Sequence, residues 1–181
     1  MMNSKYFPTV DRWNLSEAAL QASMAEMSRD GAEGNEGVAM WLGRRAKGYA
    51  TVTHVVALRG RGVIKRPAQL IIREPVFAAI TETAIDLGVS LIGQIHSHGP
   101  GHGVDLSPTD RMYGVAVPYY LSLVAPDYAM RPHTPLTACG VHMLQPGQGF
   151  RRLTVSEINT RFHLTQESLL PLIVIGDSQY G

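Results

Sequence analysis

Apolar and polar positions alternate in two patterns along this chain, one typical of helices and one of strands. Residues 16–29 carry apolar side chains at spacings near 3.6 behind Ser16, a residue type that often caps a helix start. A second helical repeat covers residues 75–87 and is ended by Gly88. Apolar, β-branched runs bounded by glycine or proline predict strands over residues 38–42, 51–58, 69–73, 91–98, 119–124, 136–144 and 150–155.

The segments between these elements complete a single-domain prediction. We expect a hairpin turn over residues 44–49, loops over 59–67 and 126–135, a short helix over 156–164 and a last strand over 170–175. Helices that interleave with strands, several of them antiparallel, predict one α/β (α+β) domain over residues 1–181, with a mixed, curved sheet flanked by helices. We expect Trp13 and Trp41 in its core, and Cys139 as a small buried residue of a strand.

The composition narrows the class of protein. The chain has 181 residues, of which 45% are hydrophobic and 17% are charged, and these values are typical of a globular domain with a sizeable core. A formal net charge of +1 gives no reason to expect nucleic acid or an anionic membrane as a partner. No apolar run approaches the ~20 residues that span a bilayer, and the N-terminus lacks the apolar core of a signal peptide. We therefore expect a cytoplasmic protein. The single cysteine excludes an intrachain disulfide and a cysteine zinc cluster.

Two histidines one residue apart end the apolar run of residues 91–98 (LIGQIHSH). Alternate side chains of a strand share a face, so His96 and His98 point the same way. After a glycine-rich loop, residues 107–110 (SPTD) predict a helix start with serine at the N-cap. Asp110 then lies in the first helical turn, where it can return to the histidines. Two imidazoles and one carboxylate leave tetrahedral zinc one open position for water, which is the arrangement of a catalytic site.

The composite of His-Ser-His, a loop and Ser-x-x-Asp resembles the signature of the JAMM (MPN-plus) zinc metalloproteases. Members of that family also use an upstream glutamate on a strand that ends in Leu-Gly, and residues 36–43 (EGVAMWLG) fit this pattern. The resemblance implies an MPN fold and one Zn²⁺ per chain. It also implies the roles of five residues: His96, His98 and Asp110 as metal ligands, Glu36 as the general base, and Ser107 as a hydrogen-bond donor to the oxyanion.

The resemblance also implies a class of substrate. The family cuts peptide or isopeptide bonds after ubiquitin or ubiquitin-like proteins, and the chain looks similar to short bacterial members, some of which accompany conjugation proteins in antiviral operons. The implied partners are a ubiquitin-like protein or its conjugates, together with activating (E1-like) and conjugating (E2-like) proteins. Two alternatives stay open: a peptidase that matures a sulfur-carrier protein of ubiquitin-like fold, and a non-catalytic MPN scaffold.

Three features of the site have more than one interpretation. The loop over residues 99–106 is one residue longer than the family's spacing, with Gly99 where a proline usually stands, but its glycines can absorb the extra residue. We expect His102 in this loop to be solvated. Ser107 and Asp110 also have the spacing of an ordinary capping box, which is compatible with a metal site. The arginines of the loop over residues 59–67 fit a solvated turn or, by resemblance, the rim of a substrate groove.

Overall fold

The structure is a computed structural model, and it describes residues 7–131, 133–168 and 171–176. Its helices and strands follow the chain in this order: β1 (Val10–Ser16), α1 (Glu17–Gly31), β2 (Val38–Ala46), β3 (Gly48–Leu58), β4 (Val63–Arg66), β5 (Gln69–Ile72), α2 (Glu74–Asp86), β6 (Ser90–Ser97), α3 (Pro108–Tyr113), β7 (Leu121–Ala125), the 3₁₀ turns η2 (Asp127–Ala129) and η3 (Leu136–Ala138), β8 (Gly140–Gln145), β9 (Gly149–Arg152), α4 (Val155–Arg161), β10 (Phe162–Thr165) and β11 (Ile173–Ile175).

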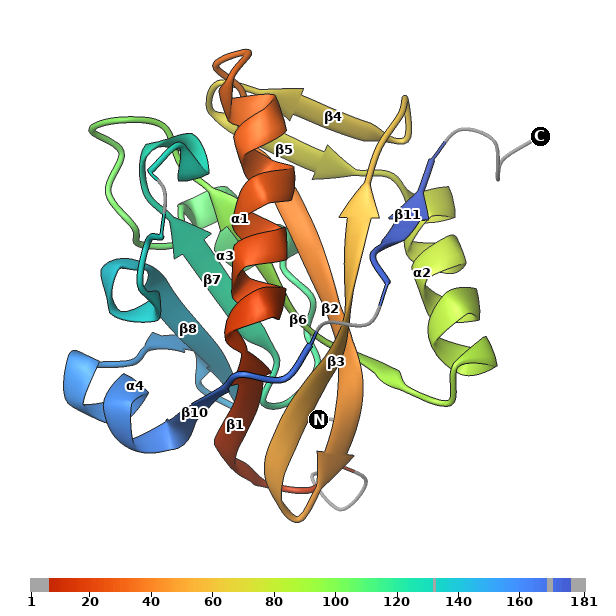
Figure 1. Ribbon diagram of the computed structural model, residues 1–181, viewed down its shortest axis with the longest axis vertical. Coiled ribbons are helices and arrows are strands. Elements are labelled where there is room, and N and C mark those ends of the chain that lie inside the picture. The colour runs from red at the N-terminus through yellow and green to blue at the C-terminus, as the bar shows by residue number, and fades with distance from the viewer. Residues whose placement is uncertain (1–6, 132, 169–170, 177–181) are drawn as a thin grey trace.

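One mixed sheet organises the fold. Its strands follow the order β10-β1-β3-β2-β6-β7-β8-β9, with β11 paired to β3, while β4 and β5 form a separate hairpin (Figure 1). β6 lies inside the sheet, antiparallel to β2 and parallel to β7. Register shifts near Leu42 interrupt the ladders of β2 with both of its neighbours, and such bulges bend and twist a sheet. The predicted α+β class, with a mixed, curved sheet flanked by helices, is confirmed.

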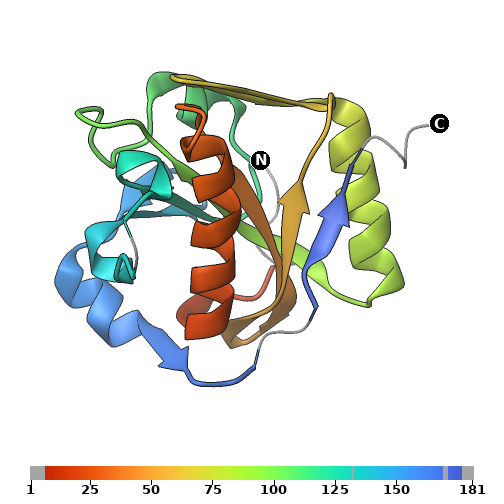
Figure 2. The ribbon, with the colours of Figure 1, turned by 45° about the horizontal axis from the view of Figure 1, so that its top comes forward.

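The sheet has an apolar core on each face, because helices cover both. α1 and α2 are separated by strands of the sheet (Figures 1 and 2). Trp41 packs in the core that contains residues of α1 and α4, whereas its neighbours Met40 and Leu42 pack in the core that contains residues of α2. Residues 38–43 of β2 are therefore all buried, and their hydrophobic pattern is a continuous run rather than an alternation.

The predicted start of α1 is confirmed in detail. The Ser16 hydroxyl accepts a hydrogen bond from the Ala19 amide at 3.0 Å, which satisfies one of the free donors of the first turn. The indole nitrogen of Trp41 donates to the Ser23 hydroxyl at 2.9 Å, so α1 is tied to β2 by a buried hydrogen bond as well as by apolar packing. Trp13 is also buried, as expected.

Several element predictions were wrong in type or extent. Residues 63–66, expected in a loop, form β4, because they pair with β5 in a hairpin. Leu136–Ala138 is a 3₁₀ turn instead of the start of a strand, so Cys139 is buried as expected but follows this turn rather than lying in a strand. Val155 opens α4 instead of ending β9, because Thr154 caps this helix through a capping box with Glu157.

The strand at the start of the described chain was not predicted. β1 pairs in parallel with β3 and with β10, two strands that lie far from it in sequence. The last predicted strand is observed as Ile173–Ile175, and Leu170 at its expected start lies outside the described residues. Across the described ranges, no helix combines the length and the apolar character needed to cross a bilayer.

Candidate metal centre

β6 delivers the two histidines to one side of the sheet, as its alternation predicts. His96 lies in the strand and His98 directly follows it, with its amide donating to the Ala125 carbonyl at 2.9 Å. Ser97 between them is fully buried, and its hydroxyl accepts from the Gly37 amide at 2.9 Å. The Ser97 amide also donates to the Gly37 carbonyl at 3.0 Å, so the histidine strand is fastened to the residue next to Glu36.

The predicted helix start brings Asp110 to the histidines. Ser107 is the N-cap of α3, and its hydroxyl accepts from the Asp110 amide at 3.1 Å. In return, Oδ2 of Asp110 accepts from the Ser107 amide at 2.8 Å. This capping box fixes the rotation of the carboxylate, and it leaves the carboxylate facing the histidines, so the cap is compatible with a metal site.

Three potential ligand atoms converge in front of β6. Nε2 of His96 lies 3.3 Å from Nε2 of His98, and Oδ2 of Asp110 lies 3.5 Å from the former and 3.4 Å from the latter. Both histidines are buried. Over the described ranges, these residues are the group of histidine, cysteine and carboxylate side chains that can hold a metal ion.

The neighbours of the cluster set its charge. Burial raises the pKa of Asp110, but its hydrogen bonds to His96 and His98 lower it more, so the pKa lies below the usual range. Burial lowers the pKa of His98, but Asp110 and Glu36 raise it more, so this pKa lies above its usual value. The carboxyl of Asp110 therefore loses its proton more readily than usual, and the imidazole of His98 keeps its proton to a higher pH than usual.

The second ring nitrogen of His98 has a backbone partner, because Nδ1 lies 3.2 Å from the Gly103 carbonyl. A carbonyl only accepts hydrogen bonds, so the neutral ring carries its hydrogen on Nδ1 and presents the lone pair of Nε2 to the other two ligands. The corresponding Nδ1 of His96 is buried and has no hydrogen-bond partner in the described part of the chain.

Glu36 lies beside the cluster, and two contacts hold its backbone. Its amide donates to the Arg66 carbonyl at 3.0 Å, and the adjoining Gly37 is bound by Ser97. Burial raises the pKa of Glu36 to about 7, the charge of His98 lowers it by less, and the charge of Asp110 raises it further. Glu36 is therefore a buried carboxyl whose pKa lies near neutral pH, and its charge interacts with two of the candidate ligands, His98 and Asp110. Glu33, the other glutamate of this segment, is exposed.

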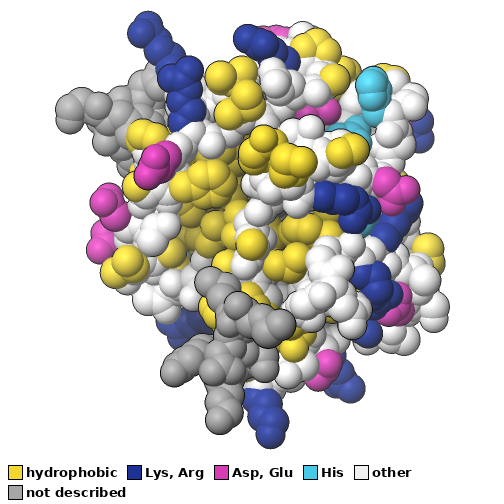
Figure 3. Space-filling view, turned by 180° about the vertical axis from the view of Figure 1, so that it is seen from behind, with side chains coloured by type: hydrophobic (Ala, Val, Ile, Leu, Met, Phe, Trp, Pro, Cys, Tyr) yellow, Lys and Arg dark blue, Asp and Glu magenta, His cyan; other side chains and the backbone are white. Residues whose placement is uncertain are grey.

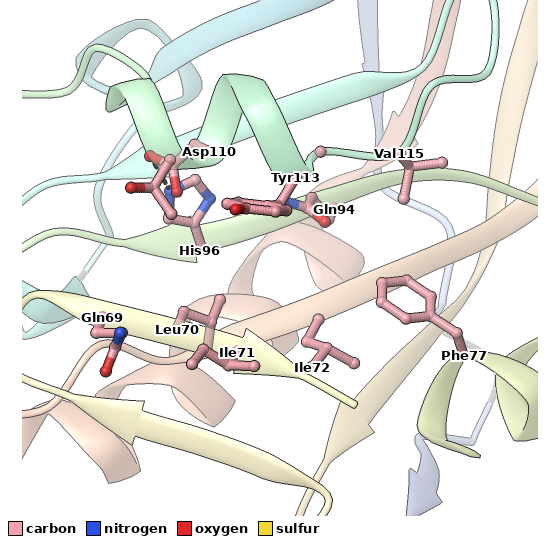
Figure 4. A pocket seen from close by; sticks show the side chains of 12 residues that line it. Gln69, Leu70, Ile71, Ile72, Phe77, Gln94, His96, Asp110, Tyr113 and Val115 are labelled. Carbon is pink, nitrogen blue, oxygen red and sulfur yellow. Dashed lines mark ion pairs between the residues drawn. The ribbon is translucent and has the colours of Figure 1, made fainter. Parts of the chain in front are cut away.

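A groove of about 510 Å³ leads to the cluster between β5 and α3. Leu70 and Ile72 of β5 and Phe77 of α2 lie along one side. The other side is formed by His96, Asp110, Tyr113 and Val115 (Figure 4). Gln94, which precedes His96 by one strand repeat, also lines it. Hydrophobic side chains gather in the centre of the molecule when it is seen from behind, on the side away from α1 (Figure 3).

Tyr128 packs against Gly99, the residue at which the sequence differs from the proline of the family it resembles. Its hydroxyl donates to the Pro67 carbonyl at 2.9 Å, and its amide donates to the His98 carbonyl at 2.7 Å. A Cβ atom at Gly99 would lie 2.6 Å from the Tyr128 hydroxyl, so a larger residue there would have to displace the Tyr128 ring. Tyr128 thus connects the β4–β5 hairpin to the end of the histidine strand, and no signal in the sequence analysis indicated this.

Three further histidines lie outside the cluster. His102 is exposed in the loop, as expected, and His133 is exposed as well. His54 is half-buried on β3, where Nδ1 lies 2.9 Å from the hydroxyl of its neighbour Thr53. The structure thus brings together His96, His98 and Asp110, with Glu36 and Ser107 beside them, from the set of candidate residues.

The fold and the site define a mixed α+β protein with a His–His–Asp group suited to a metal ion. No protein-family model matches the chain. The chain is 32% identical over 119 residues to a protein of Sinorhizobium fredii (strain NBRC 101917 / NGR234) named "Probable metalloprotease y4jG", a match that spans 60% of this chain and 67% of the relative. The chain therefore belongs to the same family as that protein.

Two solution structures share the fold. One is protein DSY2949 from Desulfitobacterium hafniense, with a TM-score of 0.62 and 18% identity, covering 86% of this chain and 94% of that one. The other is a protein from Salinibacter ruber, with a TM-score of 0.50 and 18% identity, covering 78% of this chain and 88% of that one. At such identity the likeness concerns the fold alone.

Proposed function

We propose that this chain is a zinc-dependent peptidase or isopeptidase of the JAMM type, which hydrolyses the bond after the C-terminal glycine of a ubiquitin-like protein. The observation that carries the proposal is the convergence of three ligand atoms separated by 3.3, 3.4 and 3.5 Å. Bonds of about 2.0–2.1 Å to a tetrahedral zinc place neighbouring ligand atoms roughly 3.3–3.4 Å apart. The set of two imidazoles and one carboxylate leaves the fourth position open, and the relative named as a metalloprotease adds support.

Glu36 would supply the acid–base chemistry. Zinc, when bound by His96, His98 and Asp110, lowers the pKa of a coordinated water to ~7 and polarises a carbonyl. Glu36 would take the proton from the attacking water and return it to the leaving nitrogen, which departs poorly until it is protonated. In the metal-free protein burial raises the pKa of Glu36 to about 7, so this carboxyl is one that can take and return a proton near neutral pH.

Ser107 would stabilise the oxyanion that forms on the scissile carbonyl. Its hydroxyl already accepts from the Asp110 amide, which fixes the side chain at the edge of the site. Because a hydroxyl donates while it accepts, the capping bond leaves Ser107 able to donate to the oxyanion. In this proposal one residue caps α3 and takes part in the reaction.

The groove supports an extended peptide as the substrate. Its β5 side presents the apolar residues Leu70 and Ile72, and its other end reaches His96 and Asp110. A terminal tail lying along β5 would reach the metal with its last residue, and a glycine at that place is what the resemblance to the JAMM family implies. We propose that the substrate is a ubiquitin-like protein, cut from a conjugate or from a precursor.

Metal analysis combined with a cleavage assay tests this function. The purified chain should bind one zinc, and it should cleave linear and lysine-linked fusions made from candidate ubiquitin-like proteins. A chelator should abolish cleavage and zinc should restore it, while replacement of the terminal glycine by phenylalanine in the substrate should prevent turnover.

Each arm of that experiment can contradict the proposal. Cleavage that persists in chelator would refute a metal mechanism. Equal turnover of the glycine and phenylalanine substrates would refute the preference for a terminal glycine. Stoichiometric zinc without cleavage of any glycine-ended fusion would favour the binding-only scaffold. The His98→Ala protein is the matched control, because it retains the groove and lacks one ligand.

A further inference from the structure

The loop between the second histidine and α3 has anchors of its own on β8 and β9, the last two strands at one edge of the sheet. We call residues 99–106 the 99–106 arm. It begins after His98, places the Gly103 carbonyl 3.2 Å from the Nδ1 atom of that ligand, and ends at the buried Leu106. Partners of this kind orient metal-binding histidines and raise their basicity. The position of the Gly103 carbonyl therefore matters to the candidate metal centre.

Gly140, at the start of β8, provides a seat for the arm. A Cβ atom at Gly140 would lie 1.7 Å from the Val104 carbonyl oxygen, far inside contact distance. The obstacle would be backbone, which cannot rotate away as the end of a side chain can. Gly140 is not among the glycines with positive φ, so its backbone suits any residue and only the space excludes a side chain. The arm passes β8 at this point because residue 140 is a glycine.

Asp105, the residue after Val104 in the arm, contacts side chains of β8 and β9. Its Oδ1 atom accepts a hydrogen bond from Nη1 of Arg152 at 2.9 Å and lies 3.5 Å from Nε2 of His142. The His142 side chain is fully buried, and its Nδ1 lies 3.3 Å from the Ser122 carbonyl. The carboxylate of an exposed loop is thus held against a histidine that cannot move without disturbing the sheet.

We infer that Gly140, His142 and Arg152 are positioning residues for the metal centre, because they hold Val104 and Asp105 and thereby set the Gly103 carbonyl against His98. None of the three touches a candidate ligand. They act through the backbone of the 99–106 arm, which is the segment where this chain departs from the family it resembles. The inference rests on the proposed metal site and names the residues that preorganise it.

Metal affinity of a small set of variants tests the inference. Gly140→Ala should push the arm off β8 and weaken zinc binding, measured by competition with a chromogenic chelator, by roughly the 10–100-fold that loss of a ligand's partner costs. Asp105→Ala and Arg152→Ala should each weaken it by about two- to five-fold, the size of an exposed ion pair, and the double variant should add little to either. Gly176→Ala is the matched control, because a Cβ atom there would lie 3.8 Å from its nearest neighbour.

A second readout separates positioning from general stability. In the metal-free protein, at a pH where the ring is neutral, the ¹⁵N chemical shifts of His98 should report a hydrogen on Nδ1 in the wild type and a mixture of tautomers in Gly140→Ala. Thermal unfolding of each metal-free variant monitors the fold. If Gly140→Ala does not fold, Asp105→Ala and Arg152→Ala, which create no clash, carry the test.

The outcomes distinguish this inference from the proposed function. Unchanged zinc affinity and an unchanged His98 tautomer in folded Gly140→Ala and Asp105→Ala would overturn the inference and leave the metal site intact. If the wild type binds no zinc, the proposed function fails, and the tautomer measurement still decides whether the arm positions His98.

Discussion

Two buried histidines each lie against an aspartate, Asp105 in the 99–106 arm or Asp110 just after it, and the two contacts differ in what they can bind. His142 and Asp105 are separated by 3.5 Å, the same distance as His96 and Asp110. Asp105, however, is also held by Arg152 at 2.9 Å, so a permanent cation already neutralises it. The carboxylate of Asp110 faces two imidazoles and the backbone amide of Ser107, and none of these is a permanent cation.

The difference shows that a short His–Asp distance does not by itself indicate a metal site. At Asp105 the guanidinium of Arg152 supplies the positive charge that a metal ion would otherwise supply. The Asp105 side chain is also 66% exposed. At Asp110 the carboxylate is 21% exposed and lies within 3.5 Å of the Nε2 atoms of two histidines. A divalent cation could bind the Nε2 atoms of both histidines and Oδ2 of Asp110 together. Asp105 needs no such cation, because Arg152 already balances its charge. The following predictions test this distinction.

Removing a ligand should have the largest effect. His98→Ala deletes one of three converging atoms, so zinc affinity should fall well beyond the roughly 10–100-fold expected for loss of a ligand's partner. Elemental analysis after dialysis measures this, with His54→Ala as a control because that half-buried histidine lies outside the cluster. Full zinc occupancy in His98→Ala would refute the ligand assignment.

Removing the base should separate metal binding from chemistry. Glu36→Gln keeps the shape of the side chain but cannot take a proton, so the cleavage rate should fall by the ~10²–10⁴-fold attributed to acid–base catalysis, or more. Zinc content should stay near the wild-type value. Glu33→Gln is the matched control, since Glu33 is exposed. An inactive Glu33→Gln with an active Glu36→Gln would show that the wrong glutamate has been assigned.

In the metal-free protein the pKa values of His98 and His142 should be shifted in opposite directions. The pKa of His98 is raised from 6.5, so its contribution to stability is present below 6.5 and is lost as pH rises through the folded-state pKa. The pKa of His142 is lowered from 6.5, chiefly by burial, so its contribution is present above 6.5 and is lost as pH falls through the folded-state pKa.

Imidazole proton resonances, followed by NMR from acid to alkaline pH, measure both titrations. Zinc must displace the proton from His98, so saturating zinc should remove that titration near neutral pH and leave the one of His142 in place. If zinc also abolishes the His142 titration, the contrast between the two contacts is wrong.

Glu157, like Asp105, is held by an arginine, and it should therefore behave like Asp105 and unlike Asp110. The hydrogen bond from Arg151 and the Thr154 amide lower the pKa of Glu157 to about 2. Its contribution to stability is therefore present above 4.5 and is lost as pH falls towards about 2. Glu157→Gln should cost about 0.5–1 kcal/mol in the free energy of unfolding at neutral pH, from the weakened cap and ion pair. Denaturant titration checks this, and zinc affinity should not change.

The local part of the site could be predicted from the sequence. Strand alternation places His96 and His98 on one side, and the serine at the helix start places Asp110 in the first turn, because both rules concern residues close together in the chain. The convergence of the three atoms confirms those rules. The roles of Glu36 and Ser107 and the 1–181 domain extent stay predictions.

The remainder depends on contacts between distant residues. Asp105 and Arg152 are 47 positions apart, so nothing local indicates that they meet. β1 escaped prediction because its apolar side chains, Val10, Trp13 and Leu15, do not alternate strictly, and a register shift interrupts its pairing with β3. Val63–Arg66 contains two basic residues and becomes a strand because β5 pairs with it. In each case tertiary pairing overrides the local pattern.

The position of β6 inside the sheet has a consequence for how fast a bound metal could leave. His96 pairs with β2 on one side and β7 on the other, so its amide should exchange with solvent only when the sheet as a whole opens. Asp110 instead belongs to a six-residue helix that buries none of its side chains. Small openings of α3 would release this ligand while both histidines stay in place. The lifetime of the bound ion would then be governed by the fraying of α3 rather than by the stability of the fold.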